Sequence, residues 1–127
     1  MRCQRPNRGL RWTIPVSGDA VKQYLYQVRP RRLAMITEGP DETESAVLRD
    51  HLEYLERLAE EGIVLLSGRT QTADRSTFGI VILQAESETV AKGIVAADPA
   101  VEHGVMDAQL FPYQIAVLSD SIKKPAR

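Results

Sequence analysis

The segment from Asp41 to Gly62 constrains the fold of this chain most, because it has the pattern of a single amphipathic helix. Asp41 and Glu44 stand at the spacing of a capping box, in which each side chain bonds the backbone N–H of the other residue. Apolar residues recur at three- and four-residue intervals at Leu48, Leu52, Leu55 and Ala59. Gly62 stands where a left-handed residue ends a helix. The pattern predicts a helix over residues 41–62 with one buried stripe.

Short apolar runs on both sides of this helix predict strands. Residues 22–29 are rich in β-formers and predict a strand. We expect this strand to end at Pro30, because proline cannot continue a central ladder. Two further runs, at residues 63–67 and 77–83, predict two strands that are joined by a polar loop at 69–76. The sequence therefore predicts one strand before the helix and a hairpin-like pair after it.

The remaining third of the chain predicts one more helix and one more strand. Ser87 has the character of an N-cap and Pro99 marks the end of the helix, while residues 31–40 are expected to form a loop. Residues 105–118 suit a final strand, in which Pro112 requires a bulge or an edge position. The buried stripe expected for the second helix comprises Val90, Ile94 and Ala97, and it could extend to Val101.

The resulting order is strand, helix, strand, strand, helix, strand. This is the split βαβ pattern of an α+β ferredoxin-like sandwich (βαββαβ), in which both helices cover one face of the sheet. The other face is left without a layer, and its strands are too apolar to alternate cleanly with residues that face water. The sequence therefore predicts that a second copy packs sheet to sheet, which makes a homodimer around a shared interior.

The two ends of the chain differ from its middle in composition. Up to residue 32 there are eight lysines and arginines against the single acid Asp19, although the net charge of the whole chain is −1. We expect a basic, poorly ordered leader over residues 1–20, a folded domain over 21–118 and a polar tail over 119–127. Arginines without interleaved aromatic residues favour a solvated arm over a nucleic-acid-binding surface.

The composition also bears on the location of the protein. No run approaches the roughly 18 apolar residues that a membrane span needs. Cys3 is the single cysteine, so no intramolecular disulfide and no thiolate metal site can form. We expect a cytoplasmic protein that binds neither membrane nor nucleic acid.

His51 is the most informative polar residue, because it lies on the same helical stripe as Leu55 and Leu58. A histidine in such a place is more often a satisfied core or interface residue than a catalyst. No spacing such as HExxH surrounds it, and the glycines are isolated, so neither a metal site nor a phosphate- or dinucleotide-binding loop is indicated. We expect no metal and no cofactor.

The residues from His51 to Gly68, together with Asp98-Pro99-Ala100-Val101 and Gly104-Val105, resemble the YCII-related (YciI-like) family. The resemblance implies a ferredoxin-like monomer that pairs into a dimeric α/β barrel. It also implies that the histidine and aspartate shared by the family are His51 and Asp98 here. Chloromuconolactone dehalogenase is an enzymatic relative. This chain departs from the family pattern at Ala100 and Arg69, where many members have an aromatic residue and a proline.

The resemblance makes a His51–Asp98 dyad the leading functional hypothesis. An imidazole exchanges protons near neutral pH, and a carboxylate bonded to its other nitrogen would set the tautomer. The alternative is a buried polar contact that joins two helices.

Three further residues are candidates for substrate binding. Arg69 could clamp a substrate carboxylate, or it could be a surface arginine paired with Asp74 or Glu102. Tyr26 could line the cavity, although a strand tyrosine more often packs with its hydroxyl satisfied. Ser67 could hydrogen-bond a ligand.

Together these residues predict a cofactor-independent homodimeric enzyme. It would bind a small anionic or carbonyl-bearing molecule, and His51 would move a proton in a lyase, isomerase or dehalogenase type of reaction. The alternative is a non-catalytic module that binds a ligand in the same cavity.

Overall fold

The computed structural model describes residues 21–122 of the chain. The leader expected over residues 1–20 and residues 123–127 of the expected tail lie outside this part. No helix within it is both long enough and apolar enough to cross a membrane. Its elements follow in the order β1 (Lys22–Pro30), α1 (Ala34–Thr37), α2 (Glu42–Glu60), β2 (Val64–Arg69), β3 (Gly79–Ala85), α3 (Glu88–Ala96), α4 (Pro99–Glu102) and β4 (Met106–Tyr113).

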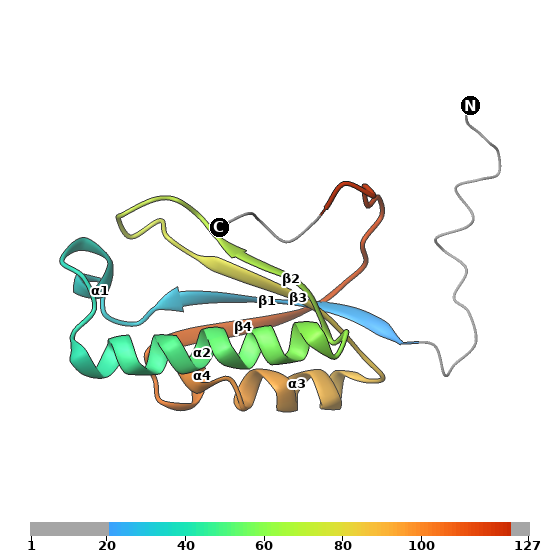
Figure 1. Ribbon diagram of the computed structural model, residues 1–127, viewed down its shortest axis with the longest axis horizontal. Coiled ribbons are helices and arrows are strands. Elements are labelled where there is room, and N and C mark those ends of the chain that lie inside the picture. Colours follow the sequence, from blue (N-terminus) through green and yellow to red (C-terminus); the bar gives the residue numbers. More distant parts are fainter. Residues whose placement is uncertain (1–20, 123–127) are drawn as a thin grey trace.

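The four strands form one antiparallel sheet in the order β2-β3-β1-β4. Helices α2, α3 and α4 lie together on one face of this sheet (Figure 1). Tyr24, Tyr26 and Val28 alternate along β1 toward the helices and are at most 4% exposed. The core therefore lies between the sheet and the helices, and the predicted ferredoxin-like sandwich is confirmed.

Helix α2 begins and ends where its pattern predicts. The Asp41 carboxylate accepts a hydrogen bond from the Glu44 N–H at 2.8 Å, and the Glu44 carboxylate accepts one from the Asp41 N–H at 2.9 Å. Gly62 follows the helix with φ +79°, a conformation that favours glycine because side chains with a Cβ are strained there. Local side-chain chemistry is sufficient to define both ends of this helix.

The predicted buried stripe of α2 is partly wrong. Leu52 is 56% exposed and Ala59 is exposed, whereas Leu55 is buried as predicted. Leu48 and Leu52 instead line a cavity beside the first half of the helix. The periodicity identified an apolar face but could not reveal that half of this face borders open space. The buried face of α2 comprises Tyr54, Leu55 and Leu58, with Glu44 at its beginning.

The predicted stripe of α3 is partly wrong, because Ile94 packs against the core as predicted but Val90 and Ala97 do not. The helix begins as predicted at Ser87, whose hydroxyl accepts a hydrogen bond from the Val90 N–H at 3.2 Å. However, Val90 is 45% exposed and Ala97 is exposed, whereas Ala91 is fully buried. The small Ala91 lets the helix backbone approach the sheet closely, and the larger Val90 consequently lies on the outer side.

Two predictions about the extent of helices and strands are also wrong. The expected loop at 31–40 contains α1, a helix of four residues that is too short to produce a periodic pattern. The last strand ends at Tyr113 rather than at residue 118. Beyond it, the Ile115 N–H donates to the side chain of Gln23 on β1 and not to the backbone of that strand. Pro112 lies on an edge strand, as predicted, because β4 pairs with β1 alone.

An ion pair attaches the α1 segment to the start of α2. The Arg32 guanidinium donates to both oxygens of Glu44, at 2.9 and 2.5 Å. The hydrogen bond from Arg32 and the backbone hydrogen bond from Asp41 lower the pKa of Glu44 from 4.5 to about 2. The carboxylate is therefore both a helix cap and an anchor for residues 31–40.

This anchor predicts a specific loss of stability in acid. Because the pKa of Glu44 is lower in the folded chain than its ordinary value of 4.5, its contribution is present above that pH and is lost as the pH falls toward 2. We expect the melting temperature of the parent to exceed that of Glu44→Gln near neutral pH, and the difference to shrink between about pH 5 and pH 2. Thermal unfolding across this range measures the difference. Glu42→Gln, on the same turn, is the control and should change the melting temperature less near neutral pH, because the Glu42 side chain makes no hydrogen bond or ion pair within residues 21–122.

Candidate functional site

His51 and Asp98 lie 47 positions apart in sequence, but the structure brings them into contact. The Nδ1 atom of His51, on α2, is 2.7 Å from Oδ1 of Asp98. The His51 side chain is 16% exposed and that of Asp98 is fully buried. The pair therefore has a buried acidic end and an imidazole end that reaches solvent-accessible space.

Local backbone chemistry places Asp98 where it is. Asp98 is the N-cap of α4, with Pro99 in the first turn, and its Oδ1 accepts a hydrogen bond from the Ala100 N–H at 2.9 Å. Aspartate favours this cap position, and proline suits the first turn because no N–H is needed there. The Asp-Pro pair, which the sequence suggested as the end of the second helix, thus begins a separate short helix.

Tyr26 completes the surroundings of Asp98. Its hydroxyl donates to Oδ2 of Asp98 at 2.7 Å, and its side chain is fully buried. Burial, and next the negative Asp98 carboxylate, raise the pKa of Tyr26 far above its usual value, so that the phenol remains a donor. Tyr26 does not line the cavity as expected from the sequence; it lies behind the dyad.

The three donors around Asp98 determine which nitrogen of His51 is available. The Tyr26 O–H and the Ala100 N–H both donate to the carboxylate, so Asp98 acts as an acceptor. Because a carboxylate only accepts, the contact at 2.7 Å is a hydrogen bond when Nδ1 of His51 carries a proton. The Nε2 lone pair of His51 is left for a ligand.

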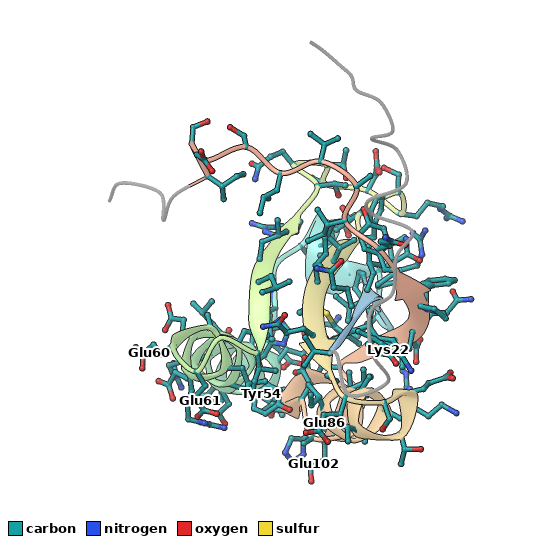
Figure 2. The ribbon with its side chains drawn as sticks, turned by 90° about the vertical axis from the view of Figure 1, so that its right-hand side faces the viewer. Lys22, Tyr54, Glu60, Glu61, Glu86 and Glu102 are labelled. Carbon is teal, nitrogen blue, oxygen red and sulfur yellow. The ribbon has the colours of Figure 1, made fainter. Side chains whose placement is uncertain are left out.

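Tyr54, one turn beyond His51, closes the buried side of this cluster. Figure 2 shows it between α2 and the α3–α4 layer, whereas Glu60, Glu61 and Glu102 lie at the outer edge of the molecule. Its hydroxyl donates to the Ile94 carbonyl at 2.6 Å. Burial, and then the negative charge of Asp98, raise the pKa of Tyr54. Its hydroxyl is thus engaged away from the dyad.

His51 borders a cavity of about 630 Å³ between the first half of α2, α1 and the ends of β1, β2 and β3. This volume lies in the range of small-molecule sites, roughly 300–1,000 Å³. The apolar part of the wall is contributed mainly by Val28, Met35, Ile36, Leu48, Leu52, Leu55, Phe78, Ile80, Val81 and Met106, and the polar part by Ser67, Arg69, Thr72 and Thr77 together with His51.

Arg69 lies at the end of β2 on the wall of this cavity. It is exposed, and within residues 21–122 its side chain makes no hydrogen bond or ion pair. Neither suggested surface partner binds it: Asp74 accepts hydrogen bonds from Ser76, and Glu102 is 3.9 Å from His103. The guanidinium is thus a cation with no acid in the described chain to neutralise it.

Ser67 also lines the cavity, from the β2 strand that carries Arg69. The sequence reasoning missed Thr72, whose hydroxyl is 3.1 Å from that of Thr77, and the two apolar α1 residues Met35 and Ile36. The apolar run at 33–36 inside an expected loop was the signal that could have revealed the α1 wall. Within the described residues no group of three histidine, cysteine or acidic side chains could hold a metal ion.

A family profile and one solved structure with a TM-score above 0.5 agree with this architecture. The profile of the YCII-related domain matches residues 26–113. The 5-chloro-2-hydroxyhydroquinone dehydrochlorinase of Burkholderia phenoliruptrix, solved in complex with 2,5-dihydroxybenzoquinone, is 20% identical over 72% of this chain and 93% of its own, with a TM-score of 0.53. An uncharacterised protein of Thermotoga maritima is 14% identical over 75% and 100% of the two chains, with a TM-score of 0.46. The search of curated proteins finds no match.

The buried carboxylate predicts how substitutions at position 98 affect stability. Asp98→Ala leaves two buried donors and the part-buried imidazole of His51 without an acceptor, and we expect a loss of about 3 kcal/mol in the free energy of unfolding. Asp98→Asn keeps one oxygen for the Ala100 N–H and offers an amide to the Tyr26 oxygen, so its loss should be nearer about 1 kcal/mol. Urea denaturation measures both values.

A surface carboxylate is the matched control for this comparison. Asp107 pairs with Arg31 at 2.6 Å, and both side chains are about 60% exposed. We expect Asp107→Ala to cost less than about 1 kcal/mol. Equal losses for the alanine and asparagine variants at position 98 would mean that the three hydrogen bonds do not govern its stability.

Proposed function

Since this chain belongs to the YCII-related family, we propose that it is a cofactor-independent enzyme in which His51 transfers a proton in a lyase, isomerase or dehalogenase type of reaction. One observation carries the proposal: the His51–Asp98 pair borders a cavity whose wall also holds the unpaired Arg69. The dyad supplies a base of defined orientation, and Arg69 supplies a charge that can hold the substrate next to it.

The charges on the cavity wall indicate the class of ligand. Among the lining residues the ionisable side chains are His51 and Arg69, and no carboxylate lines the cavity. Asp98 lies behind His51 and is fully buried. A cavity of this kind attracts a small anion or a carbonyl-bearing molecule and offers nothing to neutralise an amine. Its many apolar lining residues suit a compact carbon skeleton.

A chemical step follows from this arrangement. The Nε2 atom of His51 takes a proton from a carbon next to a carbonyl or carboxylate group, and Arg69 stabilises the negative charge that develops on the oxygen. Asp98 stabilises the imidazolium that forms. Return of the proton to another atom gives an isomerase, whereas departure of a leaving group with its electron pair gives a lyase or dehalogenase. The Burkholderia fold neighbour is named a dehydrochlorinase, which is consistent with a dehalogenase type of reaction.

We include a homodimer and a cytoplasmic location in the proposal. On the sheet face away from the helices, the strand register aligns Leu66, Ile82, Leu25 and Phe111 in one row across all four strands. A second copy packed on this row would bury it and would form the dimeric α/β barrel. A single cysteine suits a reducing compartment.

Turnover assays on small carboxylates, lactones and halogenated hydroxyaromatic compounds test the role of His51. We expect His51→Ala to lower kcat about 10²- to 10⁴-fold, which is the usual contribution of a general acid–base. The control is His103→Ala, which removes the exposed histidine at the end of α4 and should leave the rate unchanged. Ligand binding without turnover in the parent protein would favour a non-catalytic binding module instead.

The role of Arg69 predicts a selective loss of affinity. A charge-assisted hydrogen bond contributes about 1.5–3 kcal/mol, so Arg69→Gln should weaken the binding of carboxylates about 10- to 100-fold and that of neutral isosteres much less. Isothermal titration calorimetry measures both. Arg75→Gln changes an exposed arginine of the adjacent loop that does not line the cavity, and is the control. Equal weakening by both substitutions would contradict an anion site at Arg69.

The dimer predicts the effect of a charge in the apolar row. Phe111 is 39% exposed in the single chain, so Phe111→Asp should fold, yet it would place an unpaired carboxylate inside the sheet-to-sheet interface. We expect a monomer at micromolar concentration by light scattering, where the parent is a dimer. Val90→Asp alters a similarly exposed side chain on the outer side of α3 and should stay dimeric. A monomeric parent would refute the dimer.

A further inference from the structure

Tyr26 makes a buried hydrogen bond to Asp98 that neither cavity lining nor core packing explains. It lies in the middle of β1, and its side chain is fully buried. Its hydroxyl donates to Oδ2 of Asp98 at 2.7 Å, on the carboxylate oxygen that His51 does not contact. Tyr24, two residues earlier and also buried, has no hydrogen bond from its side chain within residues 21–122. The two neighbouring tyrosines thus differ in one hydrogen bond.

We propose that Tyr26 forms a triad with His51 and Asp98. It is a positioning residue that holds the carboxylate so that the imidazole keeps its proton on Nδ1. The consequence for catalysis rests on the proposed function of His51. The consequence for the tautomer does not, because it concerns the free protein.

The geometry explains how one hydroxyl can have this effect. A carboxylate rotates about its Cβ–Cγ bond unless both oxygens are held. The Ala100 N–H holds Oδ1 at 2.9 Å, and the Tyr26 hydroxyl holds Oδ2 at 2.7 Å. These two donors fix the plane of the carboxylate, and Oδ1 then faces Nδ1 of His51. Without Tyr26 the second oxygen would be a buried acceptor with no described partner.

The position of Tyr26 in the sheet makes it a rigid anchor. β1 is hydrogen-bonded on both sides, and Tyr26 stands opposite Val81 on β3 and Leu110 on β4. The two other groups that bind Asp98 belong to helical segments, α2 and α4. Tyr26 is therefore the one contact through which the sheet sets the orientation of the carboxylate.

Tyr26 is also suited to act only as a donor. Burial and the neighbouring carboxylate raise its pKa, so the hydroxyl keeps its proton near neutral pH. Tyr54, the other tyrosine of this cluster, cannot take its place because its hydroxyl donates to the Ile94 carbonyl at 2.6 Å.

The experiment compares Tyr26→Phe with Tyr24→Phe, which makes the same chemical change on the same strand face. ¹⁵N NMR of the imidazole at about pH 8.5, where histidine is ordinarily neutral, reads the tautomer without any ligand. We expect the parent and Tyr24→Phe to carry the proton of His51 on Nδ1. Tyr26→Phe should shift the population toward Nε2–H. An unchanged tautomer in a folded Tyr26→Phe protein overturns the proposal.

The steady-state constants kcat and KM, measured with a substrate that the parent converts, are the second test. Loss of a hydrogen bond to a charged group corresponds to about a 10- to 100-fold effect, so kcat of Tyr26→Phe should fall by this factor. KM should be nearly unchanged, because Tyr26 does not line the cavity. A rise in KM with constant kcat would place Tyr26 in substrate binding and overturn the positioning role.

A substitution that keeps the hydroxyl covers the case in which Tyr26→Phe does not fold. Incorporation of 3-fluorotyrosine in place of Tyr26 makes the phenol a stronger donor with little change of shape. We expect the ¹⁵N shifts of His51 to move, whereas the same label at position 24 leaves them unchanged. Equal shifts for the two labels overturn the proposal. If His51→Ala retains turnover, the proposed function fails, while these ligand-free measurements still decide the role of Tyr26.

Discussion

The buried carboxylate of Asp98 is the constraint on which the geometry of the site depends. It receives one hydrogen bond from β1, one from α2 and one from its own turn, through Tyr26, His51 and Ala100. Moving a carboxylate out of water costs several kcal/mol, and hydrogen bonds to a charged group return about 1.5–3 kcal/mol each. The two amounts are similar, so the hydrogen-bonded carboxylate adds little net stability, although truncating Asp98 alone is costly because its donors then have no acceptor. Its main effect is to hold the sheet and both helical segments in one relative position.

The same carboxylate separates two electrostatic environments. Behind His51 lies a closed cluster in which Tyr26 donates to the Asp98 carboxylate and Tyr54 donates to the Ile94 carbonyl. In front of it lies the cavity, whose wall holds Arg69 but no acid. The imidazole therefore stands between a buried negative group and a space that favours negative ligands. This arrangement is the physical basis of the proposed proton transfer next to a bound anion.

Much of the fold could be predicted from local patterns. The capping box at Asp41, the N-cap at Ser87 and the edge position of Pro112 all follow from the hydrogen-bonding capacity of single residues. The errors are of another kind. The stripes of α2 and α3 were wrong at Leu52 and Val90, because periodicity indicates an apolar face without revealing what lies opposite it. The four-residue helix α1 was missed because it is too short to have a period.

The sequence by itself determined the four strands, the two long helices, the starts of those helices and the set of polar residues that could carry chemistry, because caps, turns and periodicity act over a few positions. The tertiary structure alone decided which of these residues meet. Tyr26 and Asp98 are 72 positions apart, and His51 and Asp98 are 47 apart. Whether Tyr26 lines the cavity or supports the dyad, and whether Arg69 has a partner, depends on how the layers pack. No local spacing encodes that packing, since it results from the burial of many side chains at once.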